Sequence, residues 1–354
     1  MTVTARMRTR VYLFAAVIAA SAVIGAGYAV LLDVVIRSEL SPDSLIRGAM
    51  RGTMIGVIVW SFEIFLGVGP FCKRLRRAPF ATSLVLRTLA STTVLMAAII
   101  ASRALLSSRG HPMEQWLSAG FLRDTGFALV AVFGIHFVVQ VRRIIGGRVL
   151  ANFIFGRYHR PVNEKRIFLF LDIVGSMQIA QRLGDTGAHS MIQRFFFDIA
   201  EPVLEFGGET HRYIGDEVVI TWPMLDHVSN ARCLNCYVAI CERIAAVGPI
   251  YEKEFGIVPR FRVGLHGGPV VAGECGDDKR EIVYFGDTIN TAKRLEEACR
   301  DFDRPILISG DLLAHIELLP NQKIESLGKT VLRGRDHETE LFSLEGISDS
   351  STIF

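Results

Sequence analysis

The stretch Arg166-Ile-Phe-Leu-Phe-Leu-Asp172-Ile-Val-Gly-Ser176 places an unbroken apolar run directly before an aspartate and a glycine-containing turn. A short apolar run that ends in such a turn predicts a buried strand, with Asp172 at its end. The stretch His211-Arg-Tyr-Ile-Gly-Asp216-Glu-Val-Val-Ile220 predicts two strands joined by a tight Gly-Asp turn. Either aspartate alone is typical of a turn residue that caps its own backbone. Together, at neighbouring strand ends, the two carboxylates can hold two divalent metal ions.

A third stretch, Gly286-Asp-Thr-Ile-Asn290-Thr-Ala-Lys-Arg294-Leu295, predicts the end of a short strand followed by a helix. Asp287 or Thr288 stands at the expected N-cap position of this helix. Asn290 and Arg294 are four residues apart, so they project from the same helical face. An amide can hold a ribose, and a guanidinium can neutralise charge that develops on a phosphate. The alternative for such a pair is a solvated helix face.

In this order the three stretches resemble the class III adenylate/guanylate cyclases. That family carries an F-x-D-I-x-G-S/F strand and turn, a G-D turn and a G-D-T-x-N-x-A-x-R-L helix. The resemblance covers roughly Arg166 to Leu344, and the N-terminal part of the chain lies outside it. It implies attack of the ribose 3′-hydroxyl of a nucleoside triphosphate on the α-phosphate, which yields a 3′,5′-cyclic nucleotide and pyrophosphate.

The resemblance also implies the site residues. Two divalent cations, Mg²⁺ or Mn²⁺, would be bound by Asp172 and Asp216 with the backbone of Ile173. Asn290 and Arg294 would be the catalytic pair on the helix. Substrate contacts would come from Arg212, Val283, Arg335 and the backbone N–H groups of Ile173, Val174, Gly175, Ser176 and Met177. In the family the metal aspartates and the Asn/Arg helix meet across a dimer interface, so a homodimer is expected.

The positions that read the base depart from the family pattern. Adenylate cyclases commonly have a lysine four residues before the second metal aspartate and an aspartate or threonine seven before the ribose asparagine. Guanylate cyclases tend to have glutamate and cysteine there, whereas this chain has Arg212 and Val283. Arg212 can only donate hydrogen bonds, which suits N1 of adenine and opposes the N1–H of guanine. ATP is therefore the predicted substrate, with a guanylate cyclase as the alternative.

Three further interpretations remain beside this one. Tyr213-Ile-Gly-Asp-Glu217 resembles the G-G-D/E-E-F hairpin of diguanylate cyclases, but the first glycine is absent. A catalytically silent membrane receptor with a cyclase-like dimerisation domain would not need the paired carboxylates. A transporter is disfavoured, because the chain has neither further spans nor a broken-helix pattern.

The composition separates an N-terminal membrane part from the rest. Half of the residues are hydrophobic, and the apolar excess lies before Val141. Four stretches there approach the roughly 20 apolar residues that span a bilayer: Val11–Val35, Thr53–Cys72, Ala81–Ile100 and Gly120–Val141. Basic residues flank these spans in a pattern that places both termini in the cytoplasm. The sequence thus predicts a multi-pass protein of the cell inner (plasma) membrane, with the N-terminus and catalytic domain cytoplasmic.

The expected fold is an N-terminal four-helix transmembrane bundle plus an α+β cytosolic domain with a ferredoxin-like core. The predicted parts are a transmembrane domain over residues 1–141, a juxtamembrane linker with a short amphipathic helix over 142–163, the catalytic domain over 164–345 and a disordered tail over 346–354. Glu63 and His136 are ionisable groups within the predicted spans and are expected to face the bundle interior. The net charge of +3 does not suggest a nucleic-acid partner.

Overall fold

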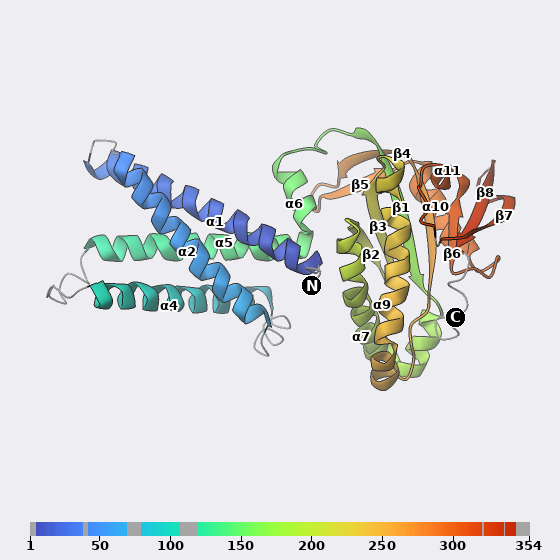
Figure 1. The fold of residues 1–354 in the computed structure, drawn as a ribbon, viewed down its shortest axis with the longest axis horizontal. Coiled ribbons are helices and arrows are strands. Elements are labelled where there is room, and N and C mark those ends of the chain that lie inside the picture. The colour runs from blue at the N-terminus through green and yellow to red at the C-terminus, as the bar shows by residue number, and fades with distance from the viewer. Residues whose placement is uncertain are drawn as a thin grey trace. The chain divides into compact units, whose positions relative to one another are not determined.

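The computed structural model describes residues 5–37, 42–68, 79–106, 119–320, 322–335 and 337–344. The chain forms two compact units, one of residues Met7–Ile154 and one that contains Phe155–Phe354 (Figure 1). The predicted tail 346–354, Cys72 and the side chain of Glu63 lie outside what is described.

Long helices build the N-terminal unit. They are α1 (Ala5–Leu32), which continues into the π-helix η1 (Asp33–Arg37), then α2 (Pro42–Val68), α4 (Phe80–Leu106) and α5 (Ala119–Ile145). His136 is buried in this unit, and its Nε2 lies 2.9 Å from the Ser91 hydroxyl. The four predicted spans therefore fall on four helices.

By length and composition, three stretches of the described residues could cross a membrane: Val11–Val35, Thr125–Arg142 and His227–Phe255. The first two belong to predicted spans. The third lies in the C-terminal unit, where its buried residues Leu234, Tyr237 and Ile240 belong to the protein core. A four-span bundle is thus only partly supported.

The predicted linker helix is present as α6 (Gly147–Ile154). It is separated from α5 by Gly146, whose φ of 96° is a backbone conformation that favours glycine. Gly156, with φ 63°, follows its end. These two glycines explain why a continuous helix does not run from α5 into the C-terminal unit.

The C-terminal unit is an α+β domain. In chain order its first elements are β1 (Val162–Ile173), α7 (Ser176–Glu205), β2 (Glu209–Ile214), β3 (Glu217–Pro223), α8 (His227–Asn230), α9 (Arg232–Phe255) and β4 (Phe261–Cys275). The sheet order β2-β3-β1-β4 and the antiparallel pairing of β1 with both β3 and β4 are those of a β-α-β-β-α-β ferredoxin-like core. The predicted core is confirmed.

Helices α7 and α9 pack side by side against the sheet (Figure 1). The core between them includes Leu169 and Leu171 of β1, Phe195 of α7 and Tyr237 of α9, all fully buried. These β1 residues alternate with Phe168 and Phe170, which are buried on the other face. A strand covered on both faces explains the unbroken apolar run.

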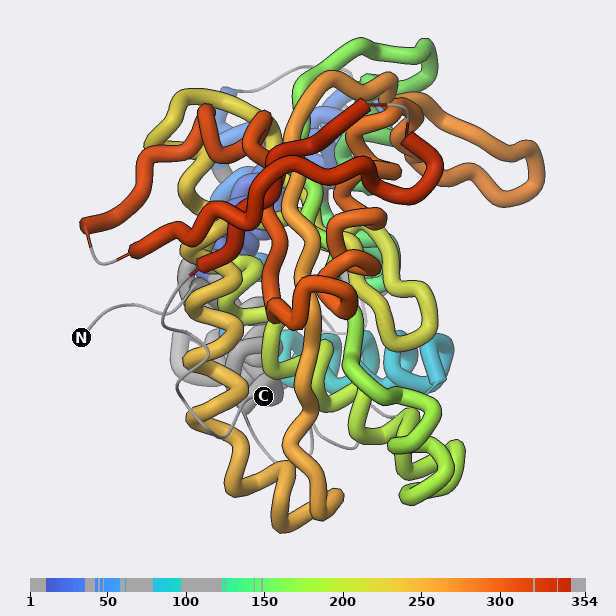
Figure 2. Tube along the Cα trace, turned by 90° about the vertical axis from the view of Figure 1, so that its right-hand side faces the viewer, coloured from blue at the N-terminus to red at the C-terminus, as the bar shows by residue number. Residues whose placement is uncertain are grey.

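The remaining elements extend the sheet. They are β5 (Glu281–Phe285), α10 (Asp287–Ala298), β6 (Ile306–Ser309), α11 (Gly310–Leu313), β7 (Ile324–Val331) and β8 (Glu338–Leu344). Strand β6 pairs with β4, and β8 lies between β6 and β7. Figure 2 shows β7 and β8, in red, running side by side.

The sequence predicts two short strands here, Arg260–His266 and Val270–Gly276, separated by Gly267-Gly-Pro269, whereas β4 is a single strand. It is continuous through Gly267, Gly268 and Pro269, which pair with β1. A Cβ at Gly268 would lie 2.8 Å from the Thr288 hydroxyl. The glycines thus permit close packing and do not end the strand.

Candidate functional site

Asp172 and Asp216 lie at the same end of the sheet. Asp172 pairs with Glu217 in the β1–β3 register, and Asp216 directly precedes Glu217 in the turn after β2. Burial, followed by the charge of Asp216, raises the pKa of Asp172 to about 7. The Gly215 at this turn has φ 64°, which explains the glycine before the aspartate.

The two aspartates differ from their acidic neighbours in their partners. Buried Glu217 and Glu296 both accept hydrogen bonds from Lys293 Nζ, which lies 2.7 Å from Glu296 Oε2. Within the described part of the chain, the carboxylates of Asp172 and Asp216 have no hydrogen-bond donor or ion-pair partner. Lys293 therefore forms ion pairs with the two glutamates, and the two aspartate carboxylates remain available as metal ligands.

The metal-ligand set is small. Among the described residues, no group of three or more His, Cys, Asp or Glu side chains is arranged to hold a metal ion. The predicted metal site has only two acidic side chains, Asp172 and Asp216, together with the backbone of Ile173, so it is smaller than a group of three side chains. Oxygen ligands of this type suit hard divalent cations.

The predicted phosphate loop runs from Ile173 into α7. Gly175 takes a left-handed conformation (φ 73°) just before the helix begins at Ser176. The Val174 N–H donates to the Arg260 carbonyl at 2.8 Å. Because Val174 is already paired, phosphate contacts in this loop would come from its other N–H groups, such as those of Gly175, Ser176 and Met177 at the helix start.

Helix α10 carries Asn290 and Arg294 as predicted, but its cap differs from the expectation. Gly286 is the N-cap residue, and the Thr288 hydroxyl donates to the Pro269 carbonyl at 2.7 Å. Asn290 is exposed, and Arg294 Nη1 donates to Glu297 Oε2 at 2.6 Å.

A cavity of about 480 Å³ lies beside Asp172. Its lining carries charged side chains of both signs: basic Arg262, Lys293, Arg294, Arg300 and Arg333, and acidic Asp172, Glu296, Glu297 and Asp301. Asp216, Asn290 and Arg335 are not among the lining residues. The cavity thus brings one predicted metal ligand and one predicted catalytic residue together within a single chain.

The sequence analysis missed Arg262, Lys293, Arg300 and Arg333. Arg262 pairs directly with Asp172 in the β1–β4 register. This position follows from the register of the β1–β4 pairing, which the sequence alone does not give. Lys293 lies beside Arg294 in the quoted helix motif, and its contact with Glu217 depends on the packing of α10 against the sheet.

The other predicted substrate residues lie apart from the cavity. Arg335 forms an ion pair with Asp287 and donates to the Thr339 hydroxyl at 3.2 Å. Arg212 on β2 forms an ion pair with Glu281 on β5, the strand that also carries Val283.

The packing of α10 depends on Gly264 in β4. A Cβ there would lie 2.3 Å from both the Ala292 carbonyl oxygen and the Glu296 nitrogen, and backbone atoms cannot swing aside. We expect Gly264→Ala to destabilise the protein by roughly 1–3 kcal/mol and to lower any activity that uses α10. Thermal unfolding of the purified chain measures the first effect.

Gly248→Ala is the matched control, because its Cβ would meet Val258 at 3.8 Å. Equal melting temperatures for Gly264→Ala and wild type would show that α10 does not rest on this glycine.

Comparison with known proteins places these features in a family. Residues 160–346 match the adenylate and guanylate cyclase catalytic domain. The chain is 42% identical over 218 residues to adenylate cyclase 2 of Rhizobium meliloti, which covers 62% of this chain and 60% of that protein. It is 27% identical over 184 residues to adenylate cyclase 1 of the same organism, covering 51% of this chain and 27% of that protein.

The fold agrees with a solved structure. A bacterial light-regulated adenylyl cyclase superimposes with a TM-score of 0.54 at 18% identity, covering 64% of this chain and 66% of that one. The chain spans less than two thirds of the length of the curated relatives described above. Its matched region holds the ferredoxin-like core, the paired aspartates and the Asn290/Arg294 helix, and on this basis the chain belongs to the family of adenylate and guanylate cyclase catalytic domains.

Proposed function

We propose that this protein is a membrane-bound adenylate cyclase, which converts ATP to 3′,5′-cyclic AMP and pyrophosphate as a homodimer. The observation that carries the proposal is the pair of carboxylates at one end of the sheet, Asp172 and Asp216, which have no hydrogen-bond donor among the described residues; Asp172 also lines a cavity that contains several arginines. The name of the relative with 42% identity, adenylate cyclase 2, supports the same activity.

The site fits two divalent cations, Mg²⁺ or Mn²⁺. Asp172 and Asp216 have no hydrogen-bond donor among the described residues, and the raised pKa of Asp172 reflects burial and the like charge of Asp216, which the charge of Lys293 offsets only in part. A cation would supply the missing positive charge. Bound there, such metals polarise the phosphate and make a hydroxyl more acidic.

The chain's own residues would bind and orient the nucleotide. Arg262, Arg300 and Arg333 of the cavity wall offer guanidinium groups that could bind the oxygens of a triphosphate. Arg294 would neutralise charge that develops on the α-phosphate, and Asn290 would hold the ribose. The N–H groups of Ser176 and Met177 at the start of α7 would bind phosphate oxygens.

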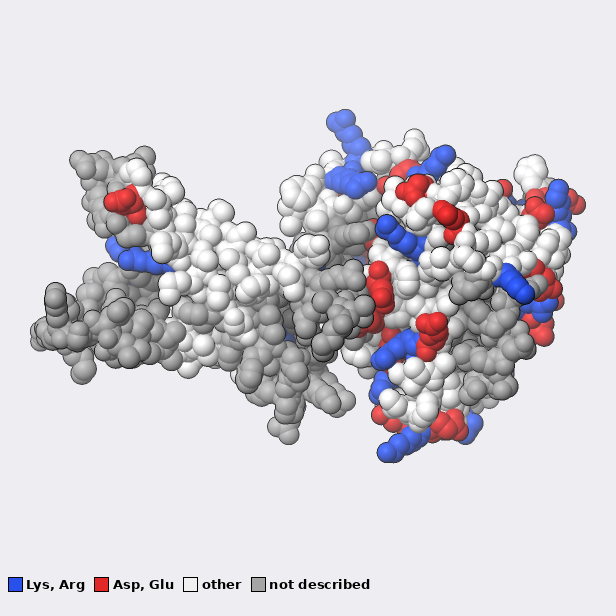
Figure 3. All heavy atoms as spheres, in the orientation of Figure 1, with Lys and Arg blue, Asp and Glu red and all other residues white. Residues whose placement is uncertain are grey.

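The membrane part of the proposal rests on the N-terminal unit. Apolar residues of α1 such as Val11, Val23 and Leu31 are more than half exposed. On the face drawn in Figure 3, few of the described residues of this unit carry charged side chains. A surface of this kind suits a lipid bilayer. The dimer would bring the α10 helix of each subunit to the aspartates of the other, as the family resemblance implies.

Incubation of the purified chain with Mn²⁺ and either ATP or GTP, followed by identification of products by mass, tests the activity. Cyclic AMP with pyrophosphate is the expected result. Formation of cyclic GMP alone would establish a guanylate cyclase, and the absence of any cyclic nucleotide would support a catalytically silent receptor.

ATP is expected to be the better substrate. Arg212 offers only donors, which match adenine N1 and oppose guanine N1–H. We expect a preference in catalytic efficiency worth about 1–3 kcal/mol, the range for a hydrogen bond with a charged partner. Measuring kcat/KM for both nucleotides checks this. Equal values, or a preference for GTP, would show that Arg212 does not read the base in this way.

A further inference from the structure

Strands β2 and β5 meet through a charged pair that the family pattern does not include. Arg212 of β2 forms an ion pair with Glu281 of β5. Lys279 Nζ lies 2.6 Å from the other carboxylate oxygen of Glu281. The side chains of Arg212 and Glu281 are 43% and 35% exposed, so a ligand can reach both.

Glu281 lies on the same face of β5 as Val283. Along this strand Ile282 and Tyr284 are buried, whereas Glu281 and Val283 are partly exposed. This alternation is that of a strand with one face covered. Glu281 therefore lies on the same face of β5 as Val283, whose side chain cannot accept a hydrogen bond from the base.

The Arg212–Glu281 pair rests on a buried layer that joins β2 to β5. Arg166 Nη2 lies 3.2 Å from Glu209 Oε2 of β2, and its guanidinium lies 5.0 Å from the centre of the Tyr284 ring of β5. His211, the neighbour of Arg212, packs edge-on against Tyr284, with the two ring centroids 4.9 Å apart. These contacts fix the two strands relative to each other.

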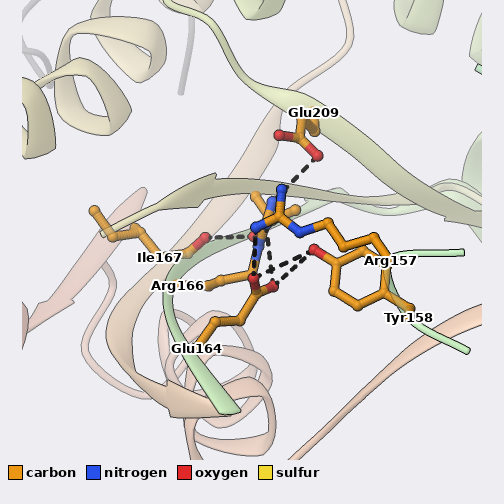
Figure 4. Close-up of polar contacts among 7 residues, drawn as sticks. Arg157, Tyr158, Glu164, Arg166, Ile167 and Glu209 are labelled. Carbon is orange, nitrogen blue, oxygen red and sulfur yellow. Dashed lines mark hydrogen bonds and ion pairs between the residues drawn. The ribbon is translucent and has the colours of Figure 1, made fainter. Parts of the chain in front are cut away.

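Further contacts hold Arg166 itself in place. Its Nε donates to the Thr221 hydroxyl at 2.9 Å, and its Nη1 lies 3.3 Å from Glu164 Oε1. The Tyr158 hydroxyl donates to both carboxylate oxygens of Glu164 at 3.2 Å. Figure 4 shows Arg166 between Glu164 and Glu209. Because these contacts hold β2 and β5 in place, Arg212 and Glu281 would lose less conformational entropy on binding a base.

Glu281 is an acceptor in this setting. Its hydrogen bond with Lys279, and then the charge of Arg212, lower the pKa of the Glu281 carboxyl. An ionised carboxylate has no donor and accepts at both oxygens. The adjacent pair thus presents a donor group and an acceptor group side by side.

We propose that Glu281 is a specificity-determining residue, which accepts a hydrogen bond from the 6-amino group of adenine while Arg212 donates to N1. The proposal rests on the adenylate cyclase function proposed above and completes its base contact. Adenine presents a donor at position 6 beside an acceptor at N1, whereas guanine presents the reverse order. Arg212 and Glu281 together therefore match adenine at both positions.

The test removes the 6-amino group from the substrate. Purine riboside 5′-triphosphate lacks only this group, so its kcat/KM relative to ATP reports the contact. In wild type we expect the analogue to be poorer by roughly tenfold or more, as for loss of a charge-assisted hydrogen bond. In Glu281→Ala the two substrates should become equal within about twofold, because the acceptor is gone.

Lys279→Ala is the matched control, since it removes the other partner of Glu281 and keeps the carboxylate. It should discriminate between ATP and the analogue as wild type does. A substrate ratio is insensitive to loss of folded protein, so a destabilised variant still gives an answer.

The outcomes separate this inference from the proposed function. Formation of no cyclic AMP by wild type would overturn the adenylate cyclase proposal itself. Cyclic AMP formation with the same penalty for the analogue in Glu281→Ala and wild type would overturn only the role of Glu281. Equal use of ATP and the analogue by wild type would also overturn only the role of Glu281.

Discussion

Replacement of Asp172 or Asp216 by alanine is expected to abolish cyclic nucleotide formation and to leave the protein folded. Each change removes an anionic ligand of the proposed metals, and the neighbouring Glu217 and Glu296 are already held by Lys293. The fold should persist, because the change relieves repulsion within a cluster of like charges. Turnover at saturating Mn²⁺ measures the first effect, and thermal unfolding measures the second.

Asp185→Ala is the matched control, because Asp185 is an exposed aspartate in α7 away from the strand ends. It should keep wild-type activity. An Asp172 or Asp216 variant that retained more than about a tenth of the wild-type rate would be inconsistent with metal-ion catalysis through that residue, which is worth several kcal/mol.

The sequence predicted the ferredoxin-like core because its signals are local. The apolar run before Asp172 and the Gly-Asp turn before Glu217 are contiguous in the chain, and antiparallel pairing follows from the short turn. Strand β4 was divided wrongly because Gly267, Gly268 and Pro269 are typical of a turn. Their role depends on Thr288 and Leu312, which pack against them from distant segments.

The contacts of the charged side chains were less predictable. Arg335, which remains a predicted triphosphate ligand, forms an ion pair with Asp287 that sequence spacing does not predict. The capping role expected of Asp287 or Thr288 was wrong, since Thr288 instead binds the Pro269 carbonyl. Both differences arise from how α10 lies against β4 and the chain after β7. Long charged side chains have several partners within reach, so sequence spacing alone does not choose between them.

Sharing of the site between two subunits is the second large effect expected. Asp172→Ala chains and Arg294→Ala chains should each be inactive, with the Arg294 loss mainly in kcat, as for a group that serves the transition state. Loss of one such group typically costs about 10²–10³ in rate. When the two variants are co-expressed, a heterodimer should regain one intact site, and activity should return to a fraction of the wild-type value.

The cavity beside Asp172 makes this experiment decisive, because Arg294 of the same chain lines it. If substrate were bound between Asp172 and Arg294 of one subunit, every subunit of the mixed dimer would lack one group and no activity would return. If Arg294 instead serves the aspartates of the partner, one of the two sites contains both intact groups. Two affinity tags, one on each variant, allow heterodimers to be isolated before assay. Verified heterodimers without activity would favour a site within one chain, and the ion pair of Arg294 with Glu297 would then be the contact that substrate must displace.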